Sequence, residues 1–334
     1  MLESHGKKIL SPVNGVASLT PDKQYFQIKQ DGSWSTVAPY HPAKYDRNSL
    51  FATLDQGGLY SLDLNQTALA EYFKSFDPNK NFSIVLSPFS RIQHLDFREL
   101  IFRDMKEAFG ELVSLIGLIF PKATISNFFL DEKLVYEHPI GFPEYFLHKQ
   151  MEMTVESAIQ SIVSCNTLYL GAETIYHILR MLYFGEPFTK RHLSVFLVDK
   201  KGRMDIEPRQ YYLTNGQSLA FILNNLETKY KVASFESVFD SIEPVDVNSL
   251  GYFNIYEQYS LTLYEKLPVV RKSFSCIDCN ECNLYCPTNA NPFSLVKNRL
   301  EEFAKNQCIV CGICTVYCPS GIDIRTKILE TKGF

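Results

Sequence analysis

The sequence predicts a multi-domain α+β protein of 334 residues. Short strand patterns open the chain, strand and helix patterns alternate through its middle, and eight of its nine cysteines lie in the last 59 residues. At ~100–200 residues per domain, this length allows two or three units, or more if some are small. Hydrophobic residues make up 46% and charged residues 21%, which is ordinary globular composition and excludes a disordered or fibrous chain.

The charge balance and hydropathy exclude two further classes of protein. Lys and Arg total 33 against 37 Asp and Glu, so there is no basic excess and we expect no nucleic-acid partner. The most apolar run, residues 112–120, is too short for a membrane-spanning helix of ~20 apolar residues. The first eight residues have no apolar core of the kind found in signal peptides. We therefore expect a cytoplasmic protein without a direct membrane span.

The cysteines of the C-terminal part follow one pattern twice. Residues 276–287 and 308–319 both have the spacing C-x2-C-x2-C-x3-C-P, and the second copy begins 32 residues after the first. This is the spacing of bacterial ferredoxins that hold two [4Fe–4S] clusters. Three thiolates two residues apart can wrap the chain around three irons of one cube, so the fourth must come from elsewhere. The pattern predicts two [4Fe–4S] clusters as cofactors.

In two-cluster domains the fourth ligand comes from the other motif. The first cluster is thus assigned four metal-binding thiolates, those of Cys276, Cys279, Cys282 and Cys318. The second is assigned the thiolates of Cys308, Cys311, Cys314 and Cys286. Pro287 and Pro319 stop any helix from continuing past the remote ligand. Gly312 permits close approach of the backbone to sulfide.

Two other kinds of cysteine site compete with this interpretation. Zinc ribbons also use paired cysteines, but they typically show two C-x2-C pairs and not two runs of four that end in Cys-Pro. A disulfide scaffold needs an oxidising compartment and usually a small secreted chain, and neither fits this sequence. The iron–sulfur interpretation is the more specific one.

The 21 residues between the two motifs are predicted to be mostly helical. Asn291 can cap this helix, and Pro292 suits its first turn. Apolar side chains then recur at helical spacing, at Phe293, Val296, Leu300 and Phe303. We expect this stripe to form the core of the small domain.

The chain before the clusters shows mixed strand and helix patterns. We expect short strands over residues 6–38, a buried strand at 81–86 and a long helix from 96 to about 117. A strand around 119–125 and a helix over 172–184 follow. Strands at 193–198 and 211–213 surround a Lys201-Gly202 turn, and a helix is expected at 218–226. This alternation favours an α/β layer in the middle of the chain.

Four other residues are of types that can form functional sites. Cys165 has no local His or acidic partner, so a small buried hydrophobe is the expected role. His138 and His148 lack neighbouring metal ligands and are expected to be isolated surface or capping residues. Lys23 follows Pro21-Asp22 in a region that resembles lipoyl and biotinyl carrier domains, but a solvated turn lysine is the simpler role. We assign no catalytic residue.

The order of these parts resembles the Rnf electron-transport complex, in the subunit that combines iron–sulfur clusters with a flavin and NADH loop. It also resembles the corresponding subunit of the sodium-translocating NADH:quinone reductase. The stretches that carry the resemblance are residues 291–295, 311–322, 166–176 and 185–187, with 137–143 similar to an element of the quinone reductase. The resemblance implies a barrel-sandwich hybrid domain at 1–40, a Rossmann-like α/β domain at 41–160, a β-grasp soluble-ligand-binding domain at 161–235 and a helical ferredoxin-like domain at 236–334.

The chain departs from this family at the flavin and NADH loop. Residues 54–60 contain two glycines where the Rnf protein carries a Gly-rich loop, and the chain has no G-x-G-x-x-G. Two glycines cannot supply the run of backbone N–H groups that a phosphate cradle needs. We therefore treat the loop as degenerate and do not expect FMN to bind.

These observations predict an electron-transfer iron–sulfur subunit of a respiratory, ion-translocating oxidoreductase of the NADH:quinone or NADH:ferredoxin type. Its expected place is peripheral, on the cytoplasmic face of the inner membrane, with the other subunits of the complex and a redox donor or acceptor protein as partners. Two alternatives stay open: a flavin-dependent NADH dehydrogenase with a degenerate FMN site, and a scaffold protein with structural clusters. The sequence does not identify the electron donor, the acceptor or the coupled ion.

Overall fold

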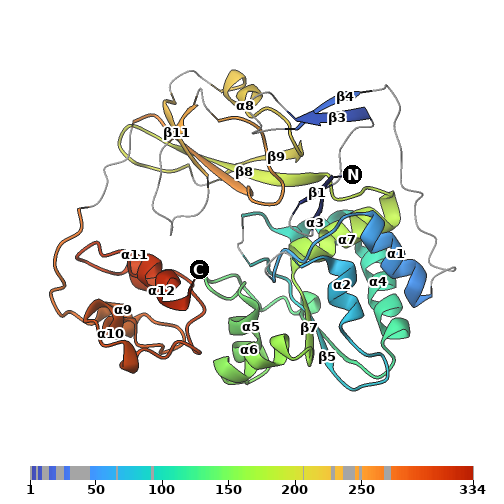
Figure 1. Cartoon of the computed structure of the whole chain (residues 1–334), viewed down its shortest axis with the longest axis horizontal. Coiled ribbons are helices and arrows are strands. Elements are labelled where there is room, and N and C mark those ends of the chain that lie inside the picture. Colours follow the sequence, from blue (N-terminus) through green and yellow to red (C-terminus); the bar gives the residue numbers. More distant parts are fainter. Residues whose placement is uncertain are drawn as a thin grey trace.

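The computed structural model of the chain describes residues 2–4, 7–9, 15–19, 26–30, 46–64, 67–91, 94–205, 207–226, 230–235, 245–247, 250–266 and 272–333. These residues form two larger sheets with helices around them and a separate helical segment that carries the cysteine motifs (Figure 1). The fold is of the α/β type with mixed sheets. Within the described ranges, none of the helices combines the length and apolar character needed to cross a bilayer.

A three-stranded parallel sheet lies in the first half of the chain. Its order is β6 (Thr124–Asn127), β5 (Ser83–Leu86) and β7 (Thr167–Leu170). Successive side chains of a strand point to opposite faces. Accordingly, Ile84 and Leu168 belong to the main apolar core, whereas Val85 and Tyr169 belong to a second core on the other face. Both faces are covered, as parallel sheets require.

Helices pack against both faces of this sheet. The main core takes side chains from α1 (Arg47–Gln56), α2 (Leu69–Lys74), α3 (Phe97–Asp104), α4 (Lys106–Ile119) and α7 (Ala172–Phe184). The second core takes them from α5 (Pro143–Gln150) and α6 (Val155–Val163), with the 3-10 turn η2 (Phe128–Leu130) nearby. The helix predicted from residue 96 is in fact two helices. The backbone of the buried Met105 leaves the helical region at φ −142° and ψ 26°, and both α3 and α4 pack against α7.

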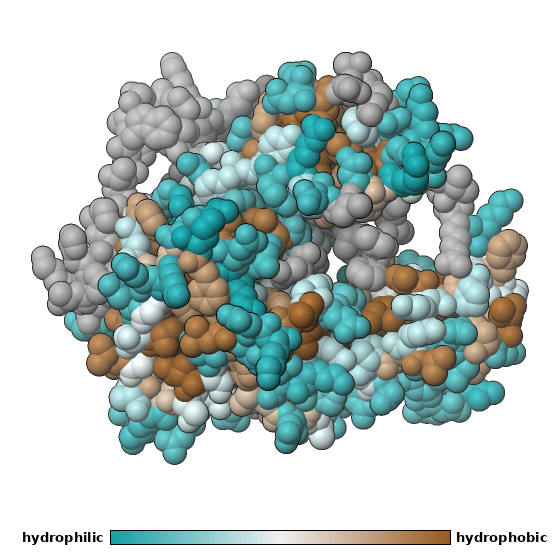
Figure 2. Space-filling view, turned by 180° about the vertical axis from the view of Figure 1, so that it is seen from behind, coloured by the Kyte–Doolittle hydropathy of each residue, from teal (hydrophilic) through white to brown (hydrophobic). Residues whose placement is uncertain are grey.

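The C-terminal segment, residues 272–333, consists of short helices. They are α9 (Glu281–Leu284), α10 (Pro292–Val296), the 3-10 turn η4 (Leu300–Glu302), α11 (Ile313–Val316) and α12 (Ile324–Lys332). The surface of this lobe carries apolar patches (Figure 2). Among its most exposed large apolar side chains are Leu284, Ile277 and Phe274, which are 72%, 66% and 65% exposed.

The second large sheet follows α7 in the chain. Its order is β11 (Val245–Asp246), β10 (Val232–Phe235), β12 (Ser260–Tyr264), β8 (Lys190–Val198) and β9 (Arg209–Thr214), with α8 (Ala220–Asn224) beside it. β12 and β8 pair in parallel, and the other neighbours are antiparallel. The unit predicted at 161–235 is not the same as this sheet. β7 belongs to the first sheet, and β12 lies inside the second.

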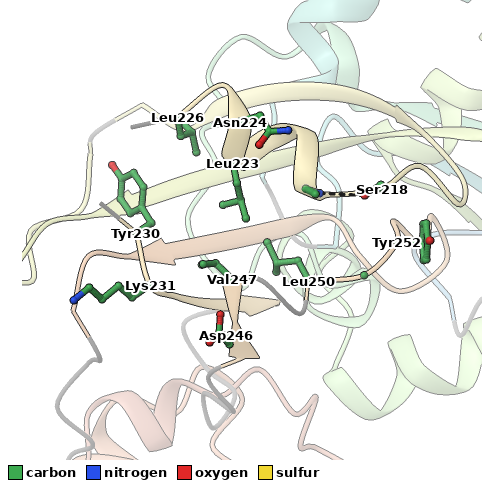
Figure 3. Close-up of a pocket in the computed structure, with 12 residues that line it drawn as sticks. Ser218, Leu223, Asn224, Leu226, Tyr230, Lys231, Asp246, Val247, Leu250 and Tyr252 are labelled. Atoms are coloured by element: carbon green, nitrogen blue, oxygen red, sulfur yellow. Dashed lines mark hydrogen bonds between the residues drawn. The ribbon is translucent and has the colours of Figure 1, made fainter. Parts of the chain in front are cut away.

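A pocket of about 850 Å³ opens beside α8 (Figure 3). Leu223 and Leu250 give it apolar walls, and Lys231 and Asp246 add one charge of each sign. None of the site residues predicted from the sequence lines this pocket.

The N-terminal strands form two antiparallel pairs. β1 (Leu2–Ser4) pairs with β2 (Lys7–Ile9), and β3 (Gly15–Leu19) pairs with β4 (Phe26–Gln30). This agrees with the short strands expected over residues 6–38. Lys23, the candidate for a modified lysine, lies outside the described residues.

Helix α7 has the bounds that the sequence predicts. The carboxylate of Asp63 lies at its N-terminus. Gly185 ends the helix in the left-handed conformation, at φ 65°. At the other end, Asp63 Oδ2 accepts hydrogen bonds from the Gly171 N–H at 2.8 Å and the Thr174 hydroxyl at 2.6 Å. Burial raises the pKa of Asp63 to about 6, although these two hydrogen bonds oppose the rise.

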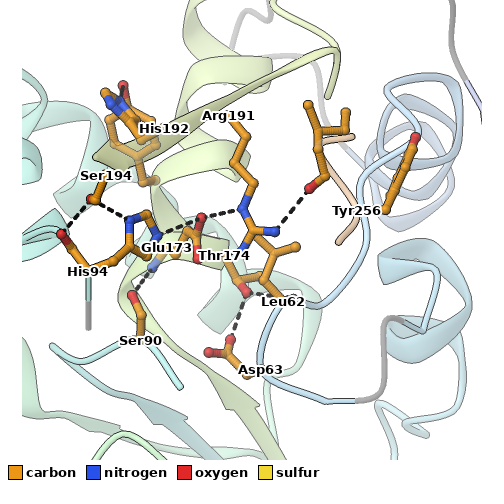
Figure 4. A network of polar contacts seen from close by, with 12 residues as sticks. Leu62, Asp63, Ser90, His94, Glu173, Thr174, Arg191, His192, Ser194 and Tyr256 are labelled. Atoms are coloured by element: carbon orange, nitrogen blue, oxygen red, sulfur yellow. Dashed lines mark hydrogen bonds and ion pairs between the residues drawn. The ribbon is translucent and has the colours of Figure 1, made fainter. Parts of the chain in front are cut away.

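A buried ion pair joins helix α7 to the second sheet (Figure 4). Arg191 of β8 donates to both carboxylate oxygens of Glu173 of α7, at 2.7 and 3.0 Å, and to the carbonyl of Ile255 at 2.9 Å. Burial alone would raise the pKa of Glu173, but the charge of Arg191 and a contact with His94 hold it well below its ordinary value. Each charge is thus paired, which is the condition for burying it at all.

We expect the Asp63→Asn variant to lose a pH dependence that the natural chain has. The pKa of Asp63 is raised on folding, so its contribution to stability is present at low pH and is lost as the pH rises towards 6. Between pH 5 and 7.5, the natural chain should lose about 1 kcal/mol of unfolding free energy relative to the variant. Urea unfolding at both pH values measures this difference. Asp131→Asn, at an exposed site, controls for charge, and parallel pH curves for the natural chain and Asp63→Asn would contradict the expectation.

Removing one member of the buried pair should cost far more than removing both. Arg191→Met should lower the unfolding free energy by about 3–5 kcal/mol, because it leaves the Glu173 carboxylate buried without its partner. The double variant Glu173→Met/Arg191→Met should cost less than the sum of the single variants, since no charge remains. Arg180→Met is the matched control, because the Arg180–Glu186 pair is partly exposed and worth about 1 kcal/mol or less. Equal losses for Arg191→Met and Arg180→Met would refute this account.

Candidate metal centre

The 32-residue repeat of the sequence is also a repeat of the backbone. α11 begins 32 residues after α9, and α12 begins 32 residues after α10. α9 packs on α11, and α10 packs on α12, so each half contacts its counterpart through equivalent elements. The two cysteine motifs therefore lie in two similar halves that face each other.

Left-handed residues repeat with the same interval. Asp278 and Asn280 have φ values of 60° and 61°, and the equivalent Val310 and Gly312 have 58° and 83°. These residues lie between consecutive cysteines, where the reversal of the backbone brings the sulfur atoms to one side. Asn and Gly accept this conformation readily, whereas a β-branched Val rarely adopts it. The strained Val310 indicates that this turn is imposed by its surroundings.

Four of the cysteines surround one pocket. They are Cys276, Cys279 and Cys282 of the first motif and Cys318 of the second. The space between them is small, about 10 Å³, and Phe293, Val296, Ile322 and Ile324 contribute to its walls. Burial raises the pKa of Cys282 to about 11, and the neighbouring Cys318 adds to the rise. The four thiols that the sequence assigns to the first cluster thus meet in an apolar setting.

The other four cysteines also lie near one another. Burial raises the pKa of Cys311 to about 12, and the charges of Cys286 and Cys308 add to it. Burial likewise raises the pKa of Cys314, with contributions from Cys311, Cys308 and Cys286. Cys286 accepts a hydrogen bond from the Ala290 N–H at 3.3 Å. Within the described residues, no three Cys, His, Asp or Glu side chains converge as a site for a single metal ion does.

This donor set fits iron–sulfur clusters. Each cluster of this kind is held by four thiolates, and in a cube each thiolate binds a different iron, so the sulfurs surround the group. Buried thiols with raised pKa values keep their protons while no metal is bound; a metal ion would displace these protons to solvent, because its positive charge compensates the thiolate. Backbone N–H groups that point at sulfur, as at Cys286, stabilise that thiolate.

The charges around the two groups differ. Asp278 lies beside Cys276 and forms an ion pair with Lys297. On the other side, Lys332 donates to the Cys308 carbonyl at 2.7 Å, and Val310 takes the position equivalent to Asp278. The first group thus has an ion pair beside its loop, Asp278 with Lys297, and the second has the Lys332 cation on its backbone.

The segment between the motifs is less helical than predicted. α10 ends after Val296, because Asn298 is left-handed at φ 57° and the Arg299 N–H bonds the Ser294 carbonyl at 2.8 Å, as in a Schellman motif. Pro292 does occupy the first turn. Asn291 makes no side-chain cap, and instead donates to the Glu302 carbonyl at 3.1 Å. Of the predicted apolar stripe, Phe303 is buried and Leu300 is 59% exposed.

His138 joins the cluster segment to the rest of the chain. Its Nε2 lies 2.8 Å from the carbonyl oxygen of Cys311, and Ile309 packs against Phe142 and Val155. His138 is therefore neither a metal ligand nor an isolated residue, and the sequence does not reveal this role because its partner lies 173 positions away. His148 caps locally, as expected, with Nδ1 2.6 Å from the Met153 carbonyl oxygen. A groove of about 660 Å³ runs along this joint.

The loop that resembles a degenerate flavin site is packed into the fold. A Cβ on Gly57 would collide with Met181 of α7, so this glycine serves close packing. A Cβ on Gly171 would likewise collide with Asp63, whose carboxylate lies at the N-terminus of α7. Helix N-termini are where phosphates commonly bind. Here the Asp63 carboxylate accepts hydrogen bonds from the Gly171 N–H and from the Thr174 hydroxyl, and Figure 4 shows the second of these contacts.

Cys165 lies apart from the two cysteine groups. It is left-handed at φ 54°, and it is half-buried against the main core and not fully buried as predicted. Its thiol lies 3.4 Å from the Ser75 hydroxyl oxygen. It is a natural control for substitutions in the two motifs.

Comparisons with known proteins reveal a likeness of fold. The chain matches no family model and no curated protein sequence. A NAD⁺-reducing [NiFe]-hydrogenase in its H2-reduced state is similar, with a TM-score of 0.51 and 9% identity over 87% of this chain and 62% of that one. The air-oxidised state gives a TM-score of 0.45 at 9% identity, over 77% and 54% of the two chains. This chain thus spans less than two thirds of the length of the hydrogenase chain that it resembles.

Proposed function

We propose that this chain is an electron-transfer iron–sulfur subunit of a membrane-associated, ion-translocating oxidoreductase complex of the Rnf or sodium-pumping NADH:quinone reductase type. The observation that carries the proposal is the pocket lined by Cys276, Cys279 and Cys282 of the first motif together with Cys318 of the second. Two [4Fe–4S] clusters bound by the eight cysteines of the two motifs supply one-electron chemistry. No residue of the chain is proposed as a catalytic acid, base or nucleophile.

The protein side chains have three tasks in this proposal. The eight thiolates hold the two groups, and apolar side chains such as Leu295 and Ile328 keep water from them. Backbone N–H groups stabilise thiolate charge, as Ala290 does at Cys286. The Asp278–Lys297 ion pair beside Cys276 and the Lys332 cation beside Cys308 make the two environments unequal, which would tune their potentials separately.

The proposed partners are the other subunits of the complex and a redox donor or acceptor protein, with the chain placed peripherally on the cytoplasmic face of the membrane. The family resemblance of the motifs supports this place. The hydrogenase chain of similar fold belongs to an enzyme that reduces NAD⁺, and this lends support to a redox role.

Flavin and NADH are not part of the proposal. Two contacts support this choice: Gly57 packs against Met181 and leaves no free space there, and the Asp63 carboxylate takes the Gly171 N–H at the start of α7 that a phosphate would need. We expect FMN added to the purified chain to keep its full fluorescence, with no bound flavin after gel filtration. Stoichiometric flavin binding would instead favour the NADH dehydrogenase alternative.

The sharing of ligands between motifs makes a sharp prediction. Cys276→Ser and Cys318→Ser should disturb the same cluster, and Cys286→Ser and Cys308→Ser should disturb the other. Each single variant should lose about half of the bound iron, since each removes one of four ligands from one cluster only. Iron analysis and electron paramagnetic resonance of the dithionite-reduced chain measure both effects.

Cys165→Ser is the matched control, because this cysteine lies outside both groups and should keep all the iron. If Cys318→Ser loses the same signal as Cys308→Ser, the exchange of ligands is wrong and each motif binds its own metal. Clusters that never change oxidation state during a redox titration would favour a scaffold role instead.

A further inference from the structure

Two tyrosines from the two halves of the cluster segment stack on each other. The ring centroids of Tyr285 and Tyr317 are 3.9 Å apart, and the ring planes differ by 19°. The two residues are 32 positions apart and therefore equivalent in the repeat. The pair thus lies where the two similar halves meet.

Each tyrosine is rigidly attached to a cysteine-bearing helix. The Tyr285 N–H bonds the Glu281 carbonyl at 3.0 Å, and the Tyr317 N–H bonds the Ile313 carbonyl at 3.0 Å. These bonds close the last turns of α9 and α11. The next residue in each case is a remote ligand, Cys286 or Cys318. A ring that is held in place therefore also holds the ligand that follows it.

Burial does not explain the stack. Tyr285 is 43% exposed and Tyr317 is 49% exposed, so neither is part of the apolar core of this segment. The core of the segment takes Leu295 from α10 and Ile324 and Ile328 from α12, and from α9 and α11 it takes only the cysteines Cys282 and Cys314. At this point of the contact between α9 and α11, the aromatic pair itself joins the two stretches of backbone before they reach their remote cysteines.

We infer that the Tyr285–Tyr317 stack is a positioning element that sets the spacing of Cys286 and Cys318, and through them the spacing of the two clusters. This inference rests on the proposed function. The face of each ring, and not its hydroxyl, does the positioning, because the contact is a stack of nearly parallel rings. Phenylalanine at both positions should therefore keep the spacing of the two cysteines, and an aliphatic residue at either position should change it.

The test measures magnetic coupling between the two reduced clusters in the full chain. Tyr285→Leu and Tyr317→Leu should keep the iron content of the natural chain but change the coupling features of the paramagnetic spectrum. The double variant Tyr285→Phe/Tyr317→Phe should keep these features. Leu284→Ala is the control, because Leu284 is 72% exposed on the same helix and outside the stack. If Tyr317→Leu assembles poorly, Tyr317→Met keeps a large apolar side chain without a ring and carries the same expectation.

The outcomes separate this inference from the proposed function. Leucine or methionine variants with full iron and unchanged coupling would overturn the inference and leave the proposed function standing, as would a natural chain whose two reduced clusters show no coupling. A natural chain without two reducible clusters would overturn the proposed function itself. The positioning role is supported if the leucine variants change the coupling and the double phenylalanine variant keeps it.

Discussion

Sulfur atoms make up a large share of the small buried core of the C-terminal segment. Its main buried cluster contains ten residues, and four of them are cysteines: Cys282, Cys308, Cys314 and Cys318. A lobe of about 60 residues buries only a modest share of its surface and is marginally stable by itself, so domains of this size commonly gain stability from a metal, a disulfide or a partner. Thiolates bound to a metal would supply the missing cohesion, because binding free energy then becomes folding free energy. The exchange of one cysteine between the halves would tie them into one unit.

The rest of the fold places this unit on a stiff support. The parallel sheet has apolar cores on both faces, and the Glu173–Arg191 pair connects helix α7 to the second sheet. His138 and the contact of Ile309 with Phe142 then attach the cluster segment to α5 and its preceding loop. Electron transfer needs fixed positions of its centres and little chemistry from the protein, and this arrangement suits that need. The loop that resembles a flavin site instead packs against α7, through Gly57 and Met181.

Sequence patterns predicted those features that depend on contacts between residues close together in the chain. The helix over 172–184 was found from its apolar spacing and from Gly185, and the cysteine spacing predicted which thiols would lie together. Contacts between distant residues decided what was missed. The break at Met105 and the inclusion of β12 in the second sheet depend on packing with other elements. The bond from His138 to Cys311 and the tyrosine stack join residues whose proximity no periodicity reveals.

The most direct test of the account is a metal and sulfide analysis of the chain purified without oxygen. Two [4Fe–4S] clusters predict about eight iron atoms and about eight acid-labile sulfides per chain, with a brown colour that dithionite bleaches. About one zinc ion per motif, with no iron and no labile sulfide, would show that the cysteines hold a structural metal and would contradict the account.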